Sequence, residues 1–179
     1  MKYPIVLLLT VLLLSVGMVS AEDLQTGKGM QTGKMMPRPI IMVESKKSGY
    51  WRSWLRFVMR SLLSQKMIDP ADVDLFQIVK SPEDARNLIV SFYKIYHSMR
   101  FVGNHLVIRI KNKLDAKQLE HINRNFQDIL VRGKIEVSGP LASEFNEPEI
   151  AHLNRLVFHF DRKNYGRLKQ LVDEINKIG

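Results

Sequence analysis

Three polar side chains near the middle of the chain could together bind an anion. Tyr93, His97 and Arg100 are spaced i, i+4 and i+7, which would place them on one face of a helix. The Arg100 guanidinium and the His97 imidazole can both donate hydrogen bonds to a phosphate or a carboxylate. The alternative is an ordinary helix flank, with a hydrogen-bonded histidine and a solvated arginine.

A basic stripe earlier in the chain is a second candidate. Arg52, Arg56 and Arg60 are spaced i, i+4 and i+8 on the side of a predicted helix opposite Trp51 and Trp54. Such a stripe could lie on an anionic lipid surface or contact an acidic partner. An ordinary amphipathic helix, with its tryptophan side in the core, explains the same pattern.

No set of residues predicts a catalytic or metal centre. The pairs Gly27-Lys28 and Gly33-Lys34 suggest a phosphate loop, but five residues separate the two glycines instead of four. Met35 also stands where that loop would carry a magnesium-binding Ser or Thr. The chain has no Cys, and its five His show no metal-ligand spacing. We therefore predict no catalytic residue, no metal site and no cofactor.

Composition indicates a globular, basic protein. The 179 residues are 45% hydrophobic and 25% charged, which allows one compact domain or two small ones. The 27 Lys and Arg exceed the 18 Asp and Glu, for a net charge of +9. That excess fits nucleic acid, anionic lipid or acidic partners, and it is also typical of a solvated surface.

The amino-terminal segment, residues 1–21, resembles a signal peptide. Lys2 precedes the apolar run 5–16, and Val19-Ser20-Ala21 fits a signal-peptidase site, so we expect cleavage after Ala21 and export, for example to a periplasm. A retained membrane anchor is the weaker interpretation because the run is short and has no basic flank after it. Residues 22–38 form a low-complexity linker in which QTGK occurs twice.

Beyond the linker the pattern predicts an α/β fold. The apolar runs 39–43 and 75–79 are typical of buried strands, and an amphipathic helix over 50–65 joins them. This βαβ arrangement predicts parallel, right-handed pairing. Ser81 and Pro82 then begin a helix expected to reach about Met99, which completes a truncated Rossmann-like βαβα unit over residues 39–101.

Residues 102–179 predict a second unit, a β-α-β-β-α extension. Strands are expected at 105–110, 134–137 and 155–160, with at least one antiparallel pair. Asp115 and Gln118 have the spacing of a capping box at the start of a helix. A carboxyl-terminal helix carries an apolar stripe formed by Leu168, Leu171, Val172, Ile175 and Ile178.

Several short runs, in order, resemble a known family. QTGKMMPRPIIMV at 31–43, YWRSWL at 50–55, MIDPADVDLF at 67–76 and PEDA at 82–85 are similar to the late part of a Rossmann domain. SFYKIYHSMRFVGNHLVIRI at 91–110 and LVFHFDRKNYGRL at 156–168 are similar to the extension that follows it. Together these runs resemble the LOG family, the lysine decarboxylase-like proteins, from about Gln31 to the carboxyl terminus.

The resemblance implies a Rossmann fold, a cytoplasmic location and a phosphoribohydrolase activity that cleaves the N-glycosidic bond of nucleoside 5′-monophosphates. That activity depends on a Pro-Gly-Gly-x-Gly-Thr-x-x-Glu loop, and this sequence contains no such segment. No catalytic residue is therefore carried over from the family.

Three functions follow from these observations. The favoured one is a non-catalytic carboxyl-terminal module of a LOG-like protein that acts by binding or assembly, because strands 39–43 and 75–79 belong inside a larger sheet. Its partner would be a second copy or a separate Rossmann half. The alternative is a phosphoribohydrolase completed by a partner that carries the glycine loop. The third is sequence-independent nucleic-acid binding through Tyr93, Tyr96, Arg100 and Phe101, whose spacing fits core packing better.

Overall fold

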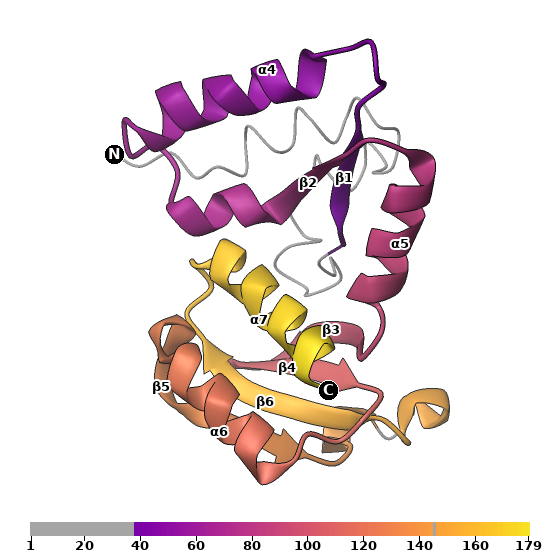
Figure 1. The fold of residues 1–179 in the computed structure, drawn as a ribbon. Coiled ribbons are helices and arrows are strands. Elements are labelled where there is room, and N and C mark those ends of the chain that lie inside the picture. The colour runs from indigo at the N-terminus through magenta and orange to yellow at the C-terminus, as the bar shows by residue number, and fades with distance from the viewer. Residues whose placement is uncertain (1–37, 145) are drawn as a thin grey trace.

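The protein is an α/β protein with two separate sheets, as seen in a computed structural model that describes residues 38–144 and 146–179 (Figure 1). One sheet has two parallel strands and the other has four antiparallel strands. The predicted signal peptide and residues 22–37 of the predicted linker lie outside the described residues.

The first sheet belongs to a unit that we call the N-terminal unit, residues 39–92. Its elements are strand β1 (Ile40–Val43), helix α4 (Tyr50–Phe57), which continues as the π-helix η1 (Val58–Leu63), the 3-10 helix η2 (Pro70–Leu75), strand β2 (Phe76–Val79) and helix α5 (Pro82–Phe92). Strands β1 and β2 pair in parallel, from Ile40 opposite Phe76 to Val43 opposite Val79. The predicted parallel pairing is confirmed.

Helix α5 is shorter than predicted, and its end changes the interpretation of the residues that follow. It begins as expected, since the Ser81 hydroxyl accepts a hydrogen bond from the Asp84 N–H at 3.1 Å. It ends at Phe92, however, and the segment expected to remain helical to Met99 forms strand β3 (Tyr96–Val102). Residues 93–95 therefore connect α5 to the antiparallel sheet.

A tight turn explains this correction. Gly103, with φ of +57°, and Asn104 link β3 to strand β4 (His105–Ile110), and Val102 lies opposite His105. A two-residue turn with glycine in a left-handed conformation is typical of hairpins. Pairing with the adjacent strand β4 thus overrides the local helical pattern.

The C-terminal unit, residues 95–179, contains the four-stranded sheet. After β3 and β4 come helix α6 (Ala116–Asn125), the short helix η3 (Gln127–Ile129), strand β5 (Leu130–Ser138), the short helices η4 (Ala142–Glu144) and η5 (Pro148–Ile150), strand β6 (Asn154–Phe160) and helix α7 (Tyr165–Ile178). The strand order is β3-β4-β6-β5, and every neighbouring pair is antiparallel. The predicted antiparallel pairing is confirmed. The predicted capping box is also present, with Asp115 and Gln118 exchanging two hydrogen bonds of 2.8 Å.

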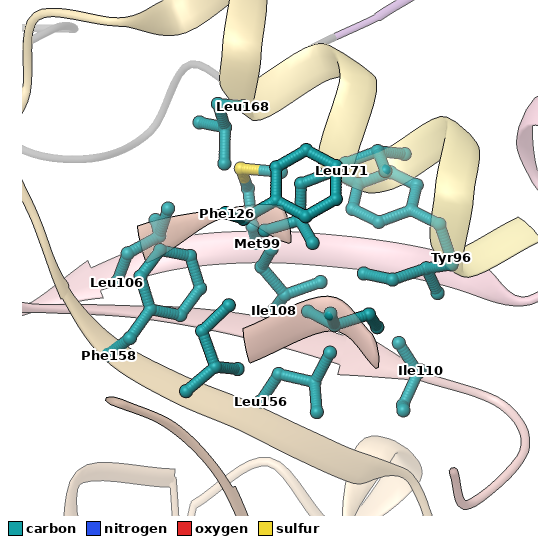
Figure 2. Close-up of a cluster of buried hydrophobic side chains, with 14 of the residues drawn as sticks. Tyr96, Met99, Leu106, Ile108, Ile110, Phe126, Leu156, Phe158, Leu168 and Leu171 are labelled. Atoms are coloured by element: carbon teal, nitrogen blue, oxygen red, sulfur yellow. The ribbon is translucent and has the colours of Figure 1, made fainter. Parts of the chain in front are cut away.

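One face of this sheet packs against α6 and α7 and forms the main core. Its side chains alternate along the strands and meet the apolar stripe of α7 (Figure 2). Full burial of each Leu, Ile or Phe stabilises the fold by about 1.5–3 kcal/mol. The labelled members are Tyr96, Met99, Leu106, Ile108, Ile110, Phe126, Leu156, Phe158, Leu168 and Leu171.

Helix α7 also joins the two units, and it lies between them in Figure 1. The Asn176 Oδ1 accepts the N–H groups of Ile95 and Tyr96 at 2.8 and 3.0 Å, and its Nδ2 donates to the Phe92 carbonyl at 2.7 Å. At the other end of α7, Gly166 lies directly against the Ala71 backbone of η2, where a Cβ would overlap the Ala71 carbonyl. These contacts fix the N-terminal unit on the C-terminal unit.

Candidate functional site

The predicted anion-binding trio is not brought together, because its members do not share a helix. Tyr93 follows the end of α5 and stacks on Tyr96 with ring centroids 6.0 Å apart. His97 and Arg100 are on β3 instead. The prediction that all three residues lie on one helical face is wrong.

Arg100 belongs to an arginine–glutamate cluster on the face of the antiparallel sheet opposite α6 and α7. The arginines come from three adjacent strands, Arg100 from β3, Arg109 from β4 and Arg155 from β6. The loop between β5 and β6 supplies two carboxylates, from Glu144 and Glu147, that lie between these arginines.

The two carboxylates pair with the three arginines at short distances and leave the cluster with one net positive charge. Glu144 accepts from Arg109 Nη2 at 2.6 Å and from Arg155 Nε at 3.0 Å. Glu147 accepts from Arg100 Nη1 at 2.5 Å and from Arg109 Nη2 at 3.1 Å. Arg155 further donates to the backbone carbonyls of the loop, including that of Ile150 at 2.9 Å.

Electrostatics supports a structural role for this cluster. Burial disfavours the ionised form of Glu144, but hydrogen bonds from the Leu141 N–H and from Arg109 and Arg155 outweigh it and hold the pKa of Glu144 below its usual range. A buried, hydrogen-bonded ion network of this kind fixes a loop on a sheet, and removing one partner leaves an uncompensated charge. The arginines therefore hold the β5–β6 loop.

His97 lies beside this cluster, with an exposed side chain on β3. Burial lowers the pKa of His97, and the charges of Lys111, Arg109 and His152 lower it further. Its Nδ1 is 2.9 Å from the Ser98 hydroxyl. Both effects disfavour the cationic form of the imidazole.

The basic stripe is exposed on α4 and η1. Arg52, Arg56 and Arg60 all have exposed side chains. Arg52 pairs through Nε with the buried Glu44 carboxylate at 2.5 Å and holds α4 against the end of β1. Arg56 and Arg60 remain on the surface of the helix and can contact a partner.

The N-terminal unit buries little of its own apolar surface. Within the described residues, Met42 and Val58 are the only buried apolar side chains of this unit that lie outside the main core. Phe92 is also buried, and it belongs to the main core. Its exposed large apolar side chains are Val43, Tyr50, Phe57, Met59, Met67, Ile89 and Val90, whereas the C-terminal unit exposes Val131 and Tyr165.

The width of the parallel sheet explains this exposure. Two paired strands lie about 4.8 Å apart, whereas a helix with its side chains is about 10 Å wide. Trp54 packs edge-on against Phe76 of β2 at 4.9 Å, yet Trp51, Trp54 and Leu55 on the inner side of α4 are only half-buried. The helix extends beyond the sheet that it covers.

Both strands of this sheet also have an outer edge beside which no other described strand lies. Glu44 donates its N–H to the Val79 carbonyl at 2.8 Å, so the N–H groups of Met42 and Glu44 point toward β2. Because successive residues of a strand alternate, the N–H groups of Ile41 and Val43 point to the outer edge. Val43 is 42% exposed there. This edge and the adjoining apolar side chains form the candidate assembly surface.

A cleft of about 300 Å³ between the two units is a weaker candidate. It contains Lys94 and Lys169, but Lys169 is paired with Asp173 at 2.6 Å. The cleft lies at the amino ends of β1 and β2, whereas open parallel sheets bind ligands at the carboxyl ends of their strands.

Comparison of the chain with models of protein families, with curated proteins and with solved structures finds no match in any of the three. No helix in the described part of the chain is long and apolar enough to cross a membrane. Across the same residues, no group of three or more His, Cys, Asp or Glu could hold a metal ion.

Two features of the site region were missed from the sequence. The Gly103-Asn104 pair lies between two runs in which apolar and polar residues alternate, which is a sequence signal for a hairpin. This signal predicts a strand before Gly103, where the structure has β3. The carboxylates of the arginine–glutamate cluster carry no local signal, because Glu144 is 35 residues from Arg109 and Glu147 is 47 residues from Arg100.

Proposed function

We propose that the chain is a non-catalytic assembly module, similar to the carboxyl-terminal part of a LOG-like protein, and that its parallel sheet is completed by a partner. The partner supplies a strand to the outer edge of β1, either from a second copy or from a separate Rossmann half. The C-terminal unit, with its closed core, supports the N-terminal unit.

The observation that carries this proposal is the outer edge of β1, beside which none of the described strands lies. Parallel sheets are ordinarily buried on both faces and have several strands, and a two-stranded ribbon is marginal by itself. The outward N–H groups of Ile41 and Val43 offer hydrogen bonds to an added strand. The half-buried inner side of α4 and the exposed Ile89 and Val90 of α5 supply apolar area for the same partner.

The proposal is tested with two substitutions at one edge position. Val43→Pro removes the outward N–H without removing a β1–β2 hydrogen bond, because the bonding N–H groups belong to Met42 and Glu44. Val43→Thr keeps the N–H and the preference for a strand, and it is the matched control. Sedimentation velocity of the full chain over a range of concentrations measures self-association.

We expect the wild type to associate as its concentration rises and Val43→Thr to behave nearly alike. Val43→Pro should weaken association about tenfold or more, since it loses a hydrogen bond and places its ring in the path of the added strand. All variants share residues 1–37, so a difference between them reports on the strand edge. A wild type that stays at the monomer mass of 20.8 kDa excludes a second copy as the partner, and unchanged association of Val43→Pro contradicts the proposed use of the β1 edge.

A further inference from the structure

The surface of α4 and η1 has a charge pattern that strand pairing does not explain. Between Ser45 and Ile68 the chain contains six basic residues and no acidic residue. All six side chains are exposed, and only Arg52 of them forms an ion pair with a described carboxylate. The six are Lys46, Lys47, Arg52, Arg56, Arg60 and Lys66.

The same segment also exposes four large apolar side chains. Tyr50 is 65% exposed and Phe57 is 54% exposed, and their spacing of two helical turns places them on the same side of α4. Met59 on η1 and Met67 just beyond it are 43% and 60% exposed. We call these four residues and the six cations the α4–η1 surface.

We propose that the α4–η1 surface docks on a membrane rich in anionic lipid. The helix lies in the plane of the interface, where Tyr50 and Phe57 enter the boundary between headgroups and acyl chains and the cations contact lipid phosphates. Long arginine and lysine side chains reach the phosphates while their aliphatic stems stay beside the apolar residues.

Charge complementarity and side-chain type together favour lipid over other anionic partners. A nucleic acid would satisfy the cations and could stack on Tyr50 and Phe57, but it offers no apolar environment to the two methionines. An interfacial lipid layer accommodates all of these side chains. The proposal is independent of strand pairing, because it uses the outward side of α4 and η1, which lies at the periphery of the molecule, away from the C-terminal unit (Figure 1).

Co-sedimentation of the full chain with vesicles tests this proposal. One vesicle type contains phosphatidylcholine with one third phosphatidylglycerol, and the other contains phosphatidylcholine alone. The test variant combines Arg56→Gln, Arg60→Gln and Lys66→Gln. Since each surface cation near an anionic membrane strengthens binding several-fold, we expect the triple variant to bind anionic vesicles about a hundredfold more weakly.

The matched control removes the same charge from exposed positions of the C-terminal unit, through Lys113→Gln, Lys117→Gln and Arg132→Gln. It should change binding by no more than about threefold, since its cations lie away from the docking face. Phe57→Ser should weaken binding about tenfold through the loss of apolar insertion.

Three results would overturn the proposal. Equal losses in the two triple variants would mean that net charge alone acts. Equal binding of the wild type to both vesicle types would assign binding to the shared residues 1–37. The surface would instead be a nucleic-acid site if two results were found together. Phe57→Ser would bind anionic vesicles as strongly as the wild type does. It would also bind a single-stranded RNA that the variant with Arg56→Gln, Arg60→Gln and Lys66→Gln no longer binds.

Discussion

Asn176 fixes the junction between the two units. Its replacement by leucine should lower the free energy of unfolding by a measurable amount. The Asn176 side chain is 8% exposed and accepts from two backbone N–H groups, those of Ile95 and Tyr96. It also donates to the Phe92 carbonyl. Asn176→Leu keeps a similar volume but leaves these three backbone groups, all outside α7, without their side-chain partner.

The magnitude follows from those three buried groups. Each of the three backbone groups left without a partner costs about 1–3 kcal/mol, and the leucine recovers about 1 kcal/mol through apolar burial, so the free energy of unfolding should fall by about 2–8 kcal/mol. Urea denaturation followed by circular dichroism measures it. Asn112→Leu, at an exposed position, is the control and should stay within about 0.5 kcal/mol of the wild type.

A second substitution at the same position tests the hydrogen-bond reasoning. Asn176→Asp keeps the shape but directs a carboxylate oxygen at the Phe92 carbonyl, so the folded protein favours the protonated acid. Its folded-state pKa is then higher than its unfolded-state pKa, and the variant should approach wild-type stability as pH falls. A loss below about 1 kcal/mol in Asn176→Leu would refute the reasoning.

Two further substitutions test other contacts. Gly166→Ala places a Cβ on the Ala71 carbonyl and should destabilise the protein by about 2 kcal/mol or more in thermal unfolding, whereas Gly139→Ala, which meets nothing within 4 Å, should be neutral. Glu144→Gln should lower the free energy of unfolding by about 3 kcal/mol at neutral pH. Since the folded state lowers the pKa of Glu144, its stabilisation is lost as pH falls through that pKa, and the gap to the wild type should narrow in acid. A constant gap would contradict the assigned ion network.

The elements predicted best are those whose ends have chemical signals of their own. Ser81 and Asp115 cap their helices as expected, and the strand at 105–110 has its predicted bounds. The parallel pairing of β1 with β2 followed from two apolar runs joined by an amphipathic helix. In each case the information lies within a few residues of the element.

The prediction that Tyr93, His97 and Arg100 share one helical face was wrong because the apolar pattern alone does not decide between a helix and a strand. The stretch Tyr96–Val102 has apolar residues that fit a helix as well as a strand, and only pairing with β4 across the Gly103 turn decides between them. The same limit applies to Arg109 and Arg155, whose carboxylate partner Glu144 lies in a distant loop. Spacing in the sequence does not report contacts of that range.

Amide hydrogen exchange of β1 tests most directly whether the parallel sheet takes up a partner strand. The N–H groups of Met42 and Glu44 pair with β2 and should be protected at every protein concentration, whereas those of Ile41 and Val43 point outward. We predict that protection of Ile41 and Val43 rises with protein concentration as the edge becomes paired. Outward amides that exchange at the same fast rate at all concentrations, in a protein that remains monomeric, would contradict the proposed assembly role.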